Sequence, residues 1–253
     1  MLTPSKKSSL ITSLKNYKKE FIKPELSELD ESGTRLMINS FLTNVLGFKP
    51  IEEIKTEYMI KGTYADYVVQ FEGSRHFLVE VKAYSIQLSE KHLRQTVNYG
   101  ANEGIDWALL TNGHQFEFYK IIFNQPIEEK LIFSIDLSDE NIDIKQAVES
   151  IQYLHKDSIS KEGLKNLWNK CEALDPSTIA SIIYSQDVIA HIKKFLKKRF
   201  KEKCSEDDIV KSLNLLLSGK VDPATVKPSR SLRKKKNSDS EPMSGDVHQA
   251  ETK

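Results

Sequence analysis

Apolar, β-favouring residues dominate two short runs within residues 64–83, which read YADYVVQFEGSRHFLVEVKA. The polar stretch EGSR separates the two runs, and this pattern predicts a β-hairpin. Together with the segment before it, the pattern predicts strands near 52–61, 64–71 and 77–83. Charged residues interrupt both runs, Asp66 in the first and Glu80 and Lys82 in the second. Charges inside buried strands are unfavourable unless something compensates them.

The segments around the hairpin predict helices and further strands. Apolar residues recur at helical spacing between Leu36 and Phe48, which predicts a helix over about 27–46. A second helix is expected from Ser89, a typical N-cap, to Gly100. IDWALLT and HQFEFYKIIF read as strands joined at Asn112-Gly113, and EEKLIFSIDL is a candidate for one more. The order α-β-β-β-α-β, with further strands at its end, predicts an α/β domain with a mixed central sheet flanked by helices.

Near residue 140 the sequence pattern changes from one typical of alternating strands and helices to one typical of helices alone. Five stretches with helical periodicity follow, with Asp175-Pro176 as a boundary or cap, so a small all-helical domain is expected over 139–220. Residues 221–253 are rich in Ser, Lys and Pro and are expected to be disordered. Residues 1–24 carry six lysines and one glutamate, which suggests a basic arm or amphipathic helix. The α/β domain is then expected over 25–138.

The composition narrows the class of protein. The 253 residues are 39% hydrophobic and 29% charged, with a net charge of +1, so any nucleic-acid contact must come from local clusters. No apolar run reaches the roughly 18 residues that a membrane span needs, and no signal peptide is visible. Cys171 and Cys204 are far apart and form no metal or redox motif. We expect a cytoplasmic protein without membrane contact.

Strand periodicity decides whether the hairpin charges can meet. Alternation places Glu80 and Lys82 on one face of their strand. Asp66 shares that face only if cross-strand partners have residue numbers with an even sum. A two-residue turn at Gly73-Ser74 pairs residue 72 with residue 75 and gives an odd sum. We therefore expect a three-residue loop or a bulge near Gly73, or strands that separate before Asp66.

Two carboxylates and an ammonium at one sheet edge have a recognisable chemistry. Neighbouring carboxylates repel and raise each other's pKa, and a divalent cation relieves the repulsion. Mg²⁺ takes one or two carboxylates and keeps waters free for a phosphate ligand. A lysine beside it can orient or deprotonate a metal-bound water, so the pattern indicates phosphodiester hydrolysis. The ordinary alternative is an edge-strand acid, Asp66, beside a surface pair, Glu80 and Lys82.

Asp66, a 13-residue gap and Glu80-Val81-Lys82 resemble the core motif of the PD-(D/E)XK nuclease superfamily, with Ala65 where a proline can stand. The neighbouring segments narrow the resemblance. ESGTR, TEYMIKG, YADYVV, LVEVKA, QTVNY and ALLTNGHQFEFYK are together similar to the N-terminal nuclease domain of type I restriction enzyme motor (R) subunits, over about residues 25–135. No GxxxxGK[ST] loop for ATP is found, so we expect a stand-alone domain without the helicase motor.

The resemblance implies roles for individual residues. Asp66 and Glu80 would be metal ligands and Lys82 the catalytic lysine. The carbonyl of Val81 often completes such a metal shell. Glu31 matches a first-helix acid that joins the site or its surroundings, although an acid in a first helical turn also suits the helix dipole. The implied ion is Mg²⁺, with Mn²⁺ as a substitute.

Gln95 and Tyr99 match a QxxxY motif that, in this branch of the superfamily, is expected to position DNA or the site. Their i,i+4 spacing places them on one helix face, with His92 near them. Leu93 and Val97 then point elsewhere, toward the core. The alternative is that Gln95 and Tyr99 are ordinary surface residues.

The segment 191–203, HIKKFLKKRFKEK, holds seven basic residues and one acid. Five of them are candidates for DNA-backbone contacts: Lys193, Lys194, Lys197, Lys198 and Arg199. A solvated lysine-rich helix face is the alternative. The patch RSLRKKK, 230–236, could add affinity for phosphates or serve only as a solubilising tail.

These observations predict a Mg²⁺-dependent endonuclease acting on DNA, of a host-defence or mobile-element type. The second hypothesis is a DNA-binding or assembly module that retains the nuclease fold and either needs other subunits of a restriction or defence system or has no turnover. Nothing in the sequence separates DNA from RNA. Cutting both strands would suggest a homodimer, since one site cuts one strand per event.

Overall fold

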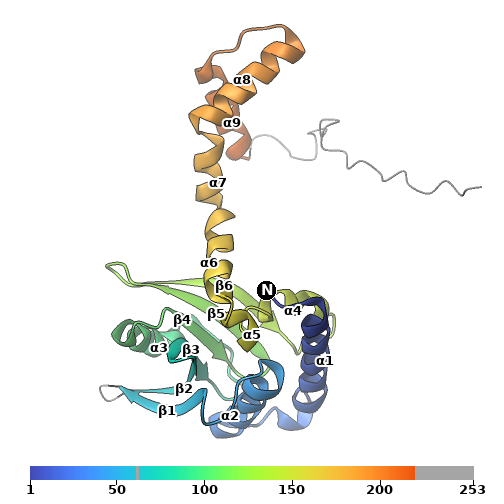
Figure 1. Ribbon diagram of the computed structural model, residues 1–253, viewed down its shortest axis with the longest axis vertical. Coiled ribbons are helices and arrows are strands. Elements are labelled where there is room, and N and C mark those ends of the chain that lie inside the picture. Colours follow the sequence, from blue (N-terminus) through green and yellow to red (C-terminus); the bar gives the residue numbers. More distant parts are fainter. Residues whose placement is uncertain (61–62, 220–253) are drawn as a thin grey trace, which may run out of the picture. The chain divides into compact units, whose positions relative to one another are not determined.

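The computed structural model describes residues 1–60 and 63–219 (Figure 1). Within these ranges, the side chains of residues 57–60, 63, 64, 90 and 95 are not described. The chain divides into two compact units, Met1–Asp175 and a second that begins at Pro176. No described helix has the length and hydropathy required to cross a lipid bilayer.

The first unit is built on a six-stranded sheet with the order β1-β2-β3-β4-β5-β6. Its strands are β1 (Ile54–Ile60), β2 (Thr63–Phe71), β3 (Ser74–Val81), β4 (Trp107–Thr111), β5 (Gln115–Ile122) and β6 (Glu128–Asp136). Strands β3 and β4 are parallel and are connected through helix α3 (Glu90–Glu103), whereas all other neighbours are antiparallel. The predicted α/β class, the mixed sheet and the additional strand β6 are confirmed.

Helices cover both faces of the sheet. One face carries the larger core, which includes residues of α1 (Pro4–Phe21), the π-helix η2 (Phe41–Val45) that continues α2 (Glu31–Ser40), and α4 (Ile144–Ile151). Phe41 of η2 stacks on Phe116 of β5 with ring centroids 4.4 Å apart. The opposite face is covered by α3, whose Leu93 and Val97 pack against Ala108 and Leu110 of β4. The unit is completed by η1 (Pro24–Leu26), α5 (Lys156–Ile159) and α6 (Gly163–Ala173).

The N-terminal helix α1 and the three helices that follow β6 directly, α4 to α6, are part of this first unit. Leu10, Leu14 and Tyr17 of α1 are buried in the larger core, together with Val148 of α4. The Tyr17 hydroxyl donates a hydrogen bond to the Gly113 carbonyl, at 2.8 Å, in the β4–β5 turn. The boundaries expected at 24/25 and 138/139 therefore lie inside one compact unit. Most lysines of α1 are exposed. The buried residues Leu10, Leu14 and Tyr17 form an apolar stripe with i, i+4, i+7 spacing, which is difficult to recognise in so lysine-rich a sequence.

The second unit consists, in its described part, of α7 (Pro176–Ile183), α8 (Gln186–Phe200) and α9 (Glu206–Leu217). Ser205 and Asp208 form a capping box that starts α9, as the serine in the sequence suggested. Ile189 and Ile209 are the buried apolar residues between residues 176 and 219. The predicted disorder of 221–253 and the basic patch 230–236 lie outside the described residues.

Candidate active site

A bulge in the β2–β3 hairpin determines which side chains share a face. Glu72 and Gly73, with φ of 49° and 76°, form a two-residue turn between Phe71 and Ser74, which are paired. This pairing has an odd sum, but the register shifts between Val69 and Gln70, and the ladder continues with Tyr67 opposite Val79, an even sum. The shift leaves His76 as the extra residue of the bulge. The bulge that we expected near Gly73 is therefore present, but it lies between Val69 and Gln70, four residues closer to Asp66.

Asp66 lies where this ladder ends. Beyond the Tyr67–Val79 pair, the carboxylate of Asp66 replaces the backbone as partner, because its Oδ2 accepts a hydrogen bond from the backbone N–H of Val81 at 2.7 Å. The residue is 8% exposed. Burial raises the pKa of Asp66, and the Val81 hydrogen bond and the Arg35 charge only partly offset that effect. The carboxylate is thus held in place by the strand that carries Glu80.

Glu80 faces the same space from β3. Its Oε1 lies 2.6 Å from the Nζ of Lys82, and its Oε2 accepts a hydrogen bond from the Thr96 hydroxyl of α3 at 3.2 Å. Burial raises the pKa of Glu80, and the negative charge of Asp66 raises it further. Burial opposes the charged form of Lys82, but its hydrogen bond to Glu80 and the negative charges of the neighbouring acids together outweigh this, and the pKa of Lys82 is raised. Lys82 is therefore an ammonium at neutral pH.

Helix α2 adds an acid and a base. The Nη2 of Arg35 lies 2.6 Å from Oδ1 of Asp66 and 3.0 Å from Oε1 of Glu31. The Nζ of Lys82 lies 3.9 Å from Oε2 of Glu31. These contacts join Glu31, Arg35, Asp66, Glu80 and Lys82 into one group, which we call the carboxylate cluster. The helix is fixed against β2 because the Tyr67 hydroxyl donates to the backbone carbonyl of Arg35 at 2.7 Å.

The ion pair between Lys156 and Glu53 provides a comparison for the pKa of Glu80 in its pair with Lys82. The Nζ of Lys156 also lies 2.6 Å from a glutamate oxygen, Oε1 of Glu53, and both Lys82 and Lys156 side chains are 20% exposed. Burial would raise the pKa of Glu53, but the hydrogen bonds from Lys156 and from the backbone of Lys49 lower it overall. The pKa of Glu80 is raised instead, because burial outweighs its hydrogen bonds and Asp66 repels it. Opposed carboxylates in a buried site are typical of functional sites.

The donor groups suit a hard divalent cation in type. Oxygen ligands from one or two carboxylates are what Mg²⁺ takes in proteins, and Asp66 and Glu80 supply them from adjacent strands. Among the residues that the structure describes, no three or more His, Cys, Asp and Glu side chains converge as a ready-made metal site. In this cluster Arg35 and Lys82 lie between the acids. The carboxylates of Asp66 and Glu80 therefore fit the ion, and Arg35 and Lys82 would compete with it for the same oxygens.

Tyr99 of the QxxxY motif is buried beneath α3. Tyr99 is 2% exposed and packs with Ala65, Val68 and Leu78, so it is not the ordinary surface residue that the alternative described. The i,i+4 spacing did not reveal that the sheet lies beneath this part of α3. Through this packing, Tyr99 supports β2 and β3, the strands that carry Asp66 and Glu80. The Gln95 side chain lies outside the described part of the structure.

Two residues of the site were not identified from sequence. Arg35 is four residues after Glu31 in ESGTR, a spacing that predicts an ion pair along a helix, and this signal was available. Thr96 stands between Gln95 and Val97, and no local pattern marks a threonine as the partner of a distant carboxylate. The contact arises only because α3 packs across β3.

The basic candidates on α8 are all exposed: Lys193, Lys194, Lys197, Lys198 and Arg199. Lys193 pairs with Glu206 of α9 at 3.2 Å, and the Arg199 guanidinium lies over the Phe200 ring at 5.3 Å. These contacts are compatible with a solvated helix face as well as with a surface for phosphates.

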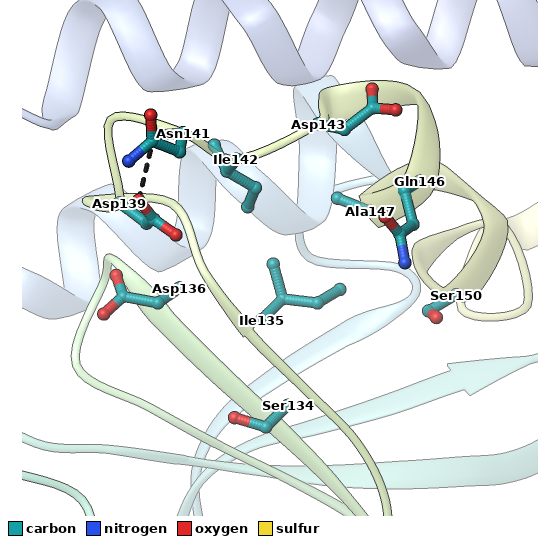
Figure 2. A pocket seen from close by; sticks show the side chains of 10 residues that line it. All are labelled: Ser134, Ile135, Asp136, Asp139, Asn141, Ile142, Asp143, Gln146, Ala147 and Ser150. Carbon is teal, nitrogen blue, oxygen red and sulfur yellow. Dashed lines mark hydrogen bonds between the residues drawn. The ribbon is translucent and has the colours of Figure 1, made fainter.

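A cavity of about 350 Å³ near the end of β6 is lined in part by acids, but it is distinct from the cluster (Figure 2). Asp139 accepts a hydrogen bond from the backbone of Asn141, and Asp143 accepts one from that of Lys145, each at 2.8 Å. Asp136 accepts from the backbone of Ser138. These acids are therefore used in turns and in the cap of α4, and the cavity adds nothing to the carboxylate cluster.

Comparison with known families gives one match, over a segment that contains this site. Residues 30–132 match the family described as Type I restriction enzyme R protein N terminus (HSDR_N). The match spans Glu31, the β2–β3 hairpin, α3 and β4–β5, which is the segment whose motifs carried the resemblance, and it confirms both that resemblance and the restriction-endonuclease-like fold class. No curated protein and no solved structure was found to match the chain.

Proposed function

We propose that this protein is a Mg²⁺-dependent nuclease that hydrolyses phosphodiester bonds in DNA. The observation that carries the proposal is that two buried carboxylates meet at the end of a bulged hairpin: Asp66, held by the Val81 N–H, and Glu80, paired with the ammonium of Lys82. This arrangement lies inside the segment that matches a restriction-enzyme family, which supports a restriction-related role with DNA as the substrate.

Each residue of the cluster has a proposed role. Asp66 and Glu80 hold the metal, with the carbonyl of Val81 and the carboxylate of Glu31 as further ligands. Bound Mg²⁺ supplies a Lewis acid and a water of lowered pKa. Since the pKa of Lys82 is raised, its ammonium stabilises negative charge on the phosphate oxygens rather than acting as a base. Thr96 and the Val81 N–H orient the two carboxylates.

A second candidate function is a DNA-binding or partner-dependent module with the same fold. The observation in its favour is that Arg35 and Lys82 already pair with the carboxylates. In this case, another subunit of a restriction or defence system would be required before the site accepts a metal.

Plasmid cleavage separates these candidates. Wild-type protein is incubated with supercoiled plasmid in Mg²⁺, Mn²⁺ or EDTA, beside Asp66→Asn, Glu80→Gln and the control Glu53→Gln. We expect metal-dependent nicking that both site variants lose and the control keeps, while retardation of DNA in gels is retained by all. DNA binding without cleavage in either metal would favour the second candidate. A labelled RNA of the same sequence tests the substrate class, and linear product without a nicked intermediate would indicate a homodimer.

A further inference from the structure

All four carboxylate oxygens of Asp66 and Glu80 are paired with a group of the protein: three accept a hydrogen bond, and Oδ1 of Asp66 forms an ion pair with Arg35. Asp66 receives Arg35 on Oδ1 and the Val81 N–H on Oδ2. Glu80 receives Lys82 on Oε1 and Thr96 on Oε2. Two of these donors, Val81 and Thr96, are neutral and orient the oxygens they bind. The other two are cations, and a divalent ion on the same oxygens would meet them at close range.

Charges in the cluster alternate along a continuous path. The path runs from Glu80 through Lys82, Glu31 and Arg35 to Asp66. Three carboxylates and two cations leave a formal charge of −1. Without these cations the buried acids would repel each other strongly, so the two bases stabilise the cluster in the absence of metal by offsetting most of its negative charge.

Arg35 is better placed than Lys82 to act as a replaceable cation. A single nitrogen, Nη2, lies within 3.0 Å of both Asp66 and Glu31, whereas the Nζ of Lys82 is close only to Glu80 and lies 3.9 Å from Glu31. Movement of Arg35 therefore frees an oxygen on each of two closely paired acids. Its backbone is held independently by the Tyr67 hydroxyl. The side chain is 30% exposed, and it can therefore leave Asp66 without any shift of α2.

We propose that Arg35 is a built-in counter-ion that competes with the divalent cation for Asp66 and thereby sets the metal affinity of the site. This inference rests on the proposed function. When the ion is absent, the guanidinium keeps Asp66 and Glu31 in position. When the ion binds, Arg35 gives up its contact with Asp66 and its guanidinium becomes available to a DNA phosphate.

Metal affinity tests the competition directly. Binding of Mn²⁺ to the full chain without DNA is measured by calorimetry for wild type, Arg35→Gln and Arg75→Gln. Arg75 is the matched control because it pairs with Glu103, and its side chain is 35% exposed. We expect Arg35→Gln to bind Mn²⁺ about tenfold more tightly than wild type and Arg75→Gln to be unchanged. Equal or weaker binding by Arg35→Gln would overturn the proposal.

A second measurement needs no variant. Phenylglyoxal labelling of wild-type arginines, read by peptide mass spectrometry, is compared in EDTA and in saturating Mn²⁺. Labelling of Arg35 should rise several-fold with Mn²⁺, while Arg75 stays constant as internal reference. Unchanged or reduced labelling of Arg35 would contradict the inference even if Arg35→Gln did not fold.

The outcomes also separate this inference from the proposed function. If wild type binds no Mn²⁺, or if Asp66→Asn binds it as well as wild type does, the proposed metal site itself is wrong. If wild type binds Mn²⁺ through Asp66 but the Arg35 results fail, the nuclease proposal stands and Arg35 is an ordinary structural ion pair.

Discussion

Lys82 and Glu80 form an ion pair with a 2.6 Å separation in which the glutamate pKa is raised rather than lowered. A nearby ammonium normally lowers a carboxyl pKa. Here burial and the charge of Asp66 outweigh it. Glu53, with an equally close lysine and no opposing acid among the causes of its shift, has a lowered pKa. The raised pKa of Glu80 therefore reports burial first and repulsion by Asp66 second, and a divalent cation would relieve both.

This difference predicts opposite pH dependences of stability in EDTA. Because the folded pKa of Glu80 is raised, its contribution to the free energy of unfolding is fully present below the usual glutamate pKa of 4.5 and is lost as the pH rises through the raised value. Wild type should therefore gain melting temperature relative to Glu80→Gln as the pH falls from 7 toward 4.5.

Glu53→Gln is the matched comparison. The folded pKa of Glu53 is lowered, so its contribution is present above 4.5 and is lost as the pH falls through the lowered value. Wild type should lose melting temperature relative to Glu53→Gln only below pH 4.5. Two difference curves of the same sign would show that Glu80 is an ordinary ion-paired glutamate.

Thr96 is expected to position Glu80. In Thr96→Val the hydroxyl that donates to Oε2 is lost while the side-chain shape is kept, and a hydrogen bond to a charged group contributes about 1.5–3 kcal/mol. We expect kcat for DNA cleavage to fall at least about tenfold, KM to change little, and the acidic limb of the pH–rate profile to move to higher pH.

Thr43→Val serves as the control for that experiment. The Thr43 hydroxyl also belongs to a helical segment but donates only to the backbone carbonyls of Asn39 and Ser40. Its cleavage rate and pH profile should match those of wild type. Equal losses in Thr96→Val and Thr43→Val would assign Thr96 a purely structural role.

The N-terminal helix is expected to be indispensable for stability. Leu14 is fully buried in the larger core, and truncation of a buried leucine costs about 2–5 kcal/mol. Leu14→Ala should lower the free energy of unfolding by that amount in urea titrations. Lys15→Ala, one position along on the exposed side of the same helix, should leave the denaturation midpoint unchanged. An unaffected Leu14→Ala would mean that α1 is a dispensable arm.

The hairpin turn offers a test of the local backbone. Glu72 and Gly73 both have positive φ, and Asn is better suited than Glu to such a conformation. Glu72→Asn should stabilise the protein by roughly 0.5–1 kcal/mol, whereas Gly73→Ala should destabilise it by about 1 kcal/mol. Space is not the reason, since nothing lies within 4 Å of a Cβ built on Gly73. Thermal unfolding of both variants checks the opposite signs.

The fold and the convergence of charges could be predicted from local patterns. Alternation gave the strands, and the parity of Asp66 and Glu80 required a bulge, which the structure has between Val69 and Gln70. Parity is a local property of two paired strands, so it can be worked out without knowledge of the rest of the chain.

Features that depend on packing between distant segments could not be predicted in this way. The i,i+4 spacing of Gln95 and Tyr99 did not show that the sheet buries Tyr99. The lysines of α1 suggested a basic arm or an amphipathic helix, and nothing local showed that Leu14 and Tyr17 of this helix pack against segments about a hundred residues away. Thr96 meets Glu80 only through the placement of α3 on β3. In each case the deciding partner is remote in sequence.

The most direct test compares two lysines that each form an ion pair with a glutamate, of which only Lys82 belongs to the carboxylate cluster. Nicking rates of supercoiled plasmid in Mg²⁺ are measured for Lys82→Ala and Lys156→Ala, whose ammonium groups have equal exposure and equal distances to a glutamate. We predict that the nicking rate of Lys82→Ala falls at least about a hundredfold. The rate of Lys156→Ala should stay close to that of wild type when it is measured at a temperature at which both proteins are folded. Equal rates for the two variants would contradict the assignment of this cluster as the catalytic site.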